Sequence, residues 1–87
     1  MINCMTISGT VTPIDGRTDT MLQVIREFEL TANATQSGAW EISGVCFKNV
    51  VVPFIRSLAQ NVESGEIDAE RGLCFTFCDG KYGAFIG

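Results

Sequence analysis

Apolar and polar residues alternate at the start of the chain. Met5, Ile7 and Val11 are separated by polar or small residues, and a spacing of two is the period of a strand that buries one face. Gly9 interrupts the run, and a glycine inside a strand indicates a bulge or the close approach of another backbone. We therefore expect a first strand over about 3–12.

The pattern over 21–33 fits two different structures. As a strand, the segment places five apolar residues on one face, with Arg26 as the exception: Leu22, Val24, Phe28, Leu30 and Ala32. As a helix capped by Asp19, it places four apolar residues on one face: Met21, Val24, Ile25 and Phe28.

The strand is favoured by what lies at the end of this segment and after it. A strand keeps Leu30 in phase, whereas a helix leaves it out of the apolar face. The polar segment 33–38 is typical of a hairpin loop, and alternation resumes at Trp40. We expect an antiparallel hairpin of 22–33 with 38–46, and the helix stays open as the alternative.

The next segment has the period of a helix. Five apolar residues recur in one stripe: Val51, Phe54, Ile55, Leu58 and Val62. Asn49 is a candidate N-cap, Pro53 falls in the first turn, where its missing N–H costs least, and Gly65 fits the left-handed position that ends a helix. Four polar residues are expected to face water: Arg56, Gln60, Asn61 and Glu63.

The C-terminal segment carries the strongest hairpin signal. Asp79-Gly80 is a candidate for a two-residue type I′ turn. Pairing outward from this turn matches three couples on one face of the two strands: Phe77 with Tyr82, Phe75 with Ala84, and Leu73 with Ile86. The register that the turn implies therefore agrees with the register that buries these residues.

Together these segments predict a single α+β domain over 1–87. Its expected order is β-β-β-α-β-β, with one amphipathic helix packed on a mainly antiparallel five-stranded sheet. We find no internal repeat or linker that would divide the chain.

Composition narrows the class of function. The net charge is −4, from six basic and ten acidic residues, so the chain lacks the basic footprint of a nucleic-acid binder. It has neither an apolar run long enough to span a membrane nor a secretory signal. We therefore expect a cytoplasmic protein that contacts no membrane and whose four cysteines are reduced: Cys4, Cys46, Cys74 and Cys78.

The residues that catalysis commonly uses are missing. The chain contains no histidine, which removes the commonest general base and metal ligand and excludes Ser–His and Cys–His pairs. Cys74 and Cys78 lie about 13 Å apart if the segment is extended, too far to chelate one ion. We expect no catalytic residue, no metal and no cofactor, and hence no enzyme.

Two surfaces are candidates for binding. The first is an acidic segment, expected to be a loop after the helix, with four carboxylates: Glu63, Glu66, Asp68 and Glu70. It suits a partner with a basic surface, although a plain solvated loop carries the same composition.

The second surface is the sheet face opposite the helix. Its expected members include six residues of the C-terminal hairpin, with Ile2, Cys4, Ile25 and Val45 beside them: Cys74, Thr76, Cys78, Lys81, Gly83 and Phe85. Such a flat, partly apolar face is typical of an interface. The alternative is that the 14–20 loop or the chain ends cover it.

The leading hypothesis is a small acidic module that binds another protein stoichiometrically. An inhibitor, an immunity protein, or a phage or mobile-element antagonist of a nucleic-acid-processing complex fits this description, and the chain itself is a further candidate partner. The partner-binding residues expected are Glu63, Glu66, Asp68, Glu70 and Phe85. The alternative is an oligomer that binds a small molecule in an aromatic pocket between subunits, with walls from Trp40, Tyr82 and Phe85.

Overall fold

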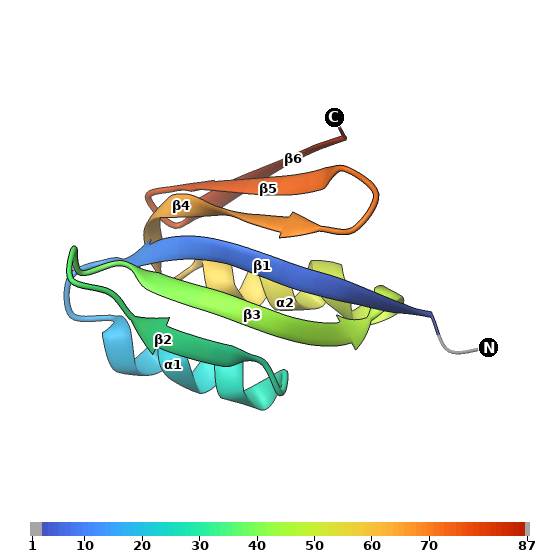
Figure 1. The fold of residues 1–87 in the computed structure, drawn as a ribbon. Helices are drawn as coiled ribbons and strands as arrows, with labels where there is room; N and C mark the ends of the chain where they lie inside the picture. The colour runs from blue at the N-terminus through green and yellow to red at the C-terminus, as the bar shows by residue number, and fades with distance from the viewer. Residues whose placement is uncertain (1–2, 87) are drawn as a thin grey trace.

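The computed structural model describes residues 3–86, which form one antiparallel sheet of six strands with two helices against one face (Figure 1). Along the chain the elements are β1 (Cys4–Pro13), α1 (Thr18–Glu27), β2 (Thr31–Ala34), β3 (Trp40–Phe47), a short 3-10 helix η1 (Lys48–Val50), α2 (Val51–Ala59), β4 (Val62–Ala69), β5 (Leu73–Cys78) and β6 (Lys81–Ile86). Within this part of the chain, no helix is long and apolar enough to cross a membrane.

The strands lie in the order β2-β3-β1-β4-β5-β6. Each helix links two strands that have a third strand between them: α1 joins β1 to β2 around β3, and α2 joins β3 to β4 around β1. This is a double split β-α-β arrangement, extended by the hairpin of β5 and β6. The predicted α+β class and antiparallel sheet are confirmed, whereas the predicted five strands and single helix are each one too few for residues 3–86.

The additional helix is α1, so the strand predicted over 22–33 is wrong for most of its length. Met21 and Ile25 are buried against the sheet, as the helical alternative required. Leu30 is buried even though the segment before it is a helix, because Glu29 adopts a left-handed conformation, with φ of 60°. The chain therefore reverses, the Leu30 N–H donates to the Ile25 carbonyl at 3.0 Å, and the Leu30 side chain enters the core. Asp19 lies in the first turn instead of capping the helix.

Helix α2 follows the predicted apolar stripe but is shorter than predicted. Its buried residues include Phe54, Ile55 and Leu58. The 3-10 helix η1 contains Asn49, so Asn49 is not the N-cap of α2. The helix ends at Ala59, well before Gly65. Val62, the last residue of the stripe, belongs to β4 and is buried in the same core.

Asn61, which was expected to face water, is buried in the turn between α2 and β4. Its carbonyl accepts from the Ile14 N–H at 2.8 Å, and its side-chain amide donates to the Ser57 carbonyl at 3.3 Å. The Arg17 guanidinium donates to Asn61 Oδ1 at 3.4 Å. Asn61 therefore connects the end of α2 to the segment that leads into α1.

The core lies between the two helices and the inner face of the sheet. Alternate residues of β1, β3, β4 and β5 meet the apolar faces of α1 and α2 there. Phe28, at the end of α1, packs edge-on against Phe54 of α2, with ring centroids 5.3 Å apart. One continuous apolar layer therefore supports all of the central strands.

The predicted C-terminal hairpin is confirmed, including its register. Asp79 and Gly80 both have positive φ, as a type I′ turn requires, and all three predicted couples are paired. Phe75 and Phe77 are buried, whereas Ile86 is 79% exposed. On the inner side of β6, Tyr82 is half-buried whereas Ala84 and Ile86 are exposed, so burial decreases toward the C-terminal end of this strand.

The neighbouring strands β1 and β4 approach closely at two glycines. A Cβ at Gly9 would collide with the Glu66 carbonyl oxygen and the Ile67 Cα, and a Cβ at Gly65 would collide with the Thr10 carbonyl oxygen. Gly65 also has φ of 134°, a conformation that L side chains rarely adopt. Gly65 is therefore needed within β4 and plays no part in ending α2.

The packing of α2 generates the first prediction. Leu58→Asp places a carboxylate in the core and should lower the free energy of unfolding by at least about 3 kcal/mol. The matched control is Val52→Asp on the same helix, because Val52 is 42% exposed and an acid in the first turn is favoured by the helix dipole. Thermal melts followed by circular dichroism compare the two. Equal melting temperatures for Leu58→Asp and wild type would contradict this placement of α2.

Candidate functional site

The face of the sheet that the helices leave uncovered, here called the outer face, is the main candidate site. The pairing registers place its residues in rows across five strands. One row runs from β3 to β6 through Ser43, Ser8, Asp68, Cys74 and Phe85. The next row contains Glu41, Thr10, Glu66, Thr76 and Gly83.

The acidic segment belongs to this face, which corrects the prediction that it is a loop. It forms strand β4, in which Ile67 and Ala69 are buried while Glu66 and Asp68 are exposed between them. The two binding surfaces that the sequence suggested separately are therefore one surface.

The two remaining predicted acids lie at the ends of this strand. Glu70 follows β4 and is tied to β1, because the Thr6 hydroxyl donates to its carboxylate at 2.9 Å. Glu63 is exposed near the start of β4, where the register with β1 shifts between Thr12 and Pro13. Glu66 and Asp68 are thus the two acids placed within the central rows.

Most residues predicted for the outer face do lie there. The registers place eight of them on it: Cys4, Val45, Cys74, Thr76, Cys78, Lys81, Gly83 and Phe85. Ile25 was predicted wrongly, because it is buried in α1 on the other side of the sheet. Ile2 lies outside the described residues. The hydroxyl residues of β1 and Glu41 of β3 were missed, although alternation along those strands indicates them.

Polar groups occupy the middle of the outer face and apolar groups occupy its margins. Glu66 and Asp68 of β4 lie between hydroxyl residues of β1 on one side and Thr76 and Cys74 of β5 on the other. At the margins, Val45 is 56%, Phe47 54% and Phe85 52% exposed. Val45 and Phe47 stand on β3, whereas Phe85 stands on β6 at the opposite edge of the sheet. The face thus offers a central acidic band with apolar contacts on both sides.

All four cysteines are free thiols. Burial, and to a smaller extent the neighbouring Cys4, raises the pKa of the Cys46 thiol. Loss of hydration, followed by the carboxylates of Asp68 and Glu66, raises the pKa of the Cys74 thiol. Both thiols are therefore held protonated at neutral pH, which makes them poor nucleophiles. Within residues 3–86, no group of three or more acidic or cysteine side chains is arranged to hold a metal ion.

The three aromatic residues suggested for a small-molecule pocket lie apart within one chain. Trp40, with Leu22 and Arg26, lines a groove beside α1. Tyr82 packs edge-on against Phe75 at 6.2 Å on the inner side, whereas Phe85 lies on the outer face. A single chain therefore does not assemble these residues into one wall.

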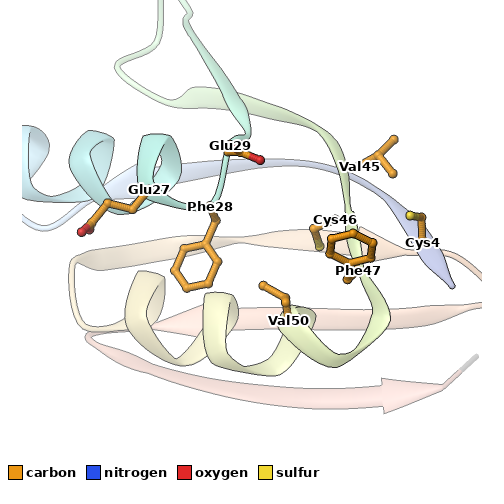
Figure 2. A pocket seen from close by; sticks show the side chains of 8 residues that line it. All are labelled: Cys4, Glu27, Phe28, Glu29, Val45, Cys46, Phe47 and Val50. Atoms are coloured by element: carbon orange, nitrogen blue, oxygen red, sulfur yellow. The ribbon is translucent and has the colours of Figure 1, made fainter. Parts of the chain in front are cut away.

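A second groove opens at the edge of the sheet between the end of α1 and the end of β3 (Figure 2). Its volume is about 360 Å³. Phe28, Cys46 and Val50 supply apolar lining, and Glu27 and Glu29 supply carboxylates. None of these residues was predicted to form a site, because they come together only through the folding of α1.

Comparison of the chain with protein-family models, with curated proteins and with solved structures finds no match.

The positions of the thiols generate the second prediction. Iodoacetamide at pH 7.5 should alkylate the exposed Cys4 and Cys78 faster than Cys74 and Cys46. A raised pKa lowers the thiolate fraction at any pH below it, so the rate at Cys74 should increase as the pH rises toward that pKa. Tandem mass spectrometry of the labelled protein measures each rate, and labelling in guanidinium chloride is the control in which the four rates converge. Fastest labelling at Cys74 would contradict the arrangement of β4 and β5.

Proposed function

We propose that this protein binds another protein stoichiometrically through its outer face and acts as an inhibitor or antagonist of that partner. The observation that carries the proposal is the position of Glu66 and Asp68 in the middle of an exposed sheet face with apolar residues at its margins. No catalytic step is part of the proposal.

The apolar margins are suited to anchor a partner. Val45, Phe47 and Phe85 are each more than half exposed, and burying large apolar side chains is a main source of affinity at protein interfaces. An open sheet face fits another folded surface better than it encloses a small molecule. The hydroxyl groups of β1 supply hydrogen-bonding partners across the centre of such an interface.

The acidic band favours a partner with a basic surface. The carboxylates of β4 add to a net charge of −4, which repels nucleic acid and attracts basic proteins. Proteins that process nucleic acids carry basic surfaces for phosphate groups, and an acidic face can occupy such a surface. We therefore propose that the partner is a protein that processes nucleic acids.

The acidic band generates the third prediction. Glu66→Lys combined with Asp68→Lys should slow association with a partner isolated by affinity capture by about tenfold or more at low salt, and should flatten the salt dependence. The matched control is Asp15→Lys combined with Asp19→Lys, which makes the same charge change in the loop and first turn of α1. Surface plasmon resonance measures both rates. Equal slowing by the two pairs would assign the effect to net charge and contradict a role for β4.

The apolar margin generates the fourth prediction. Phe85→Ala should mainly accelerate dissociation, by about tenfold or more, because buried aromatic anchors determine residence time. Ile86→Ala is the control, since Ile86 is the next residue on β6 and points to the other side of the sheet. The same instrument measures the dissociation rate. An unchanged rate for Phe85→Ala, together with unchanged association of the acidic-band variant, would place the interface elsewhere.

A further inference from the structure

Strand β3 extends beyond its neighbour β2. The partner residues of β2 on β3 are Trp40 to Ser43, whereas β3 continues to Phe47. In the part of the chain that the structure describes, the segment 44–47 has a strand only on its β1 side (Figure 1). The segment 44–47, here called the open edge of β3, therefore has no neighbouring strand on the side away from β1.

The direction of the backbone groups at this edge follows from one hydrogen bond. The Lys48 N–H donates to the Asn3 carbonyl at 2.9 Å, in register with the pairing of β3 and β1. Because hydrogen-bonded and non-hydrogen-bonded pairs alternate in an antiparallel ladder, Val45 and Phe47 direct their N–H and C=O groups away from β1. No described residue outside the strands hydrogen-bonds to these backbone groups.

The open edge faces the groove beside α1. Figure 2 shows Glu27 and Phe28 on one side of the groove, and Val45, Cys46 and Phe47 on the other. Val50 lies below. Free strand hydrogen-bonding groups and an apolar cavity therefore meet at one place.

We propose that this groove binds an extended peptide segment of a partner protein, which adds as a strand to the edge of β3. Backbone groups of the peptide pair with those of Val45 and Phe47, as in β-strand addition. An apolar side chain of the peptide contacts Phe28, Cys46 and Val50, and a lysine or arginine beside it faces Glu27 and Glu29. The inference does not rest on the proposed function, because the groove can bind a peptide whether or not the outer face binds a protein.

Charge distinguishes a basic peptide from a second copy of the chain as the occupant. Two copies, each with a net charge of −4, repel one another, whereas a basic segment is attracted to the exposed carboxylates of Glu27 and Glu29. The open edge is also short, because it spans only 44–47 of β3. It therefore fits a short segment in extended conformation.

The test begins with selection from a displayed library of random nonapeptides against the intact protein, followed by fluorescence polarisation with a synthetic selected peptide. We expect selected peptides that alternate apolar residues with lysine or arginine. Val45→Pro removes an N–H that points into the groove and should weaken binding by about tenfold or more. Ala84→Pro is the matched control, because Ala84 lies on β6, a strand at the far edge of the sheet, and directs its N–H away from β5. Its affinity should stay within about twofold of wild type.

Two further measurements keep the proposal testable if Val45→Pro does not fold. With wild-type protein, N-methylation of alternate peptide amides should abolish binding for the set that faces β3 and spare the set that faces away. Glu27 is exposed at the end of α1, where the helix dipole favours a lysine. Glu27→Lys should therefore weaken the binding of a basic peptide by about threefold or more.

Four results would overturn the proposal. The first two are that no peptide is enriched, or that N-methylation has equal effects at both sets of amides. The last two are that Ala84→Pro loses binding while Val45→Pro keeps it, or that the protein dimerises in sedimentation experiments and Val45→Pro abolishes the dimer. The last two would assign the peptide to β6 or the groove to a second copy of the chain.

Discussion

The packing of both helices on one face of the sheet is the constraint on which the rest of the structure depends. Side chains of a strand alternate between the two faces, so covering one face divides every central strand into a buried set and an exposed set. The buried set forms one continuous core with α1 and α2. The exposed set brings the acids of β4, the hydroxyls of β1 and the thiols of β5 onto one surface.

The elements with a strong local pattern could be predicted from the sequence. The turn at Asp79-Gly80 specified the register of β5 and β6, and the apolar stripe specified the buried face of α2. Helix α1 was kept only as the alternative to a strand, because the burial of Leu30 depends on the left-handed conformation of Glu29, which no local pattern indicates. Strand β4 was missed because its charges obscure the alternation of Ile67 and Ala69.

The candidate site was predictable only in pieces, for a related reason. Alternation placed Thr76 and Phe85 on one face, but uniting them with Glu66 and Asp68 requires the pairing of β4 with β1 and β5. Residues far apart in the chain form that pairing. It also needs the close approach that Gly9 and Gly65 allow. The groove at β3 depends in the same way on where α1 ends.

The most direct test of this account is whether the two faces of the sheet differ in their access to solvent. NMR relaxation with a soluble gadolinium chelate measures this for each methyl group. The account predicts strong relaxation enhancement at the methyl groups of Val45 and Thr10 on the outer face, and little at Ile42 and Ile67, which are 1% and 0% exposed. Equally weak relaxation enhancement at Val45 and Thr10 as at Ile42 and Ile67 would contradict an open outer face and the function proposed for it.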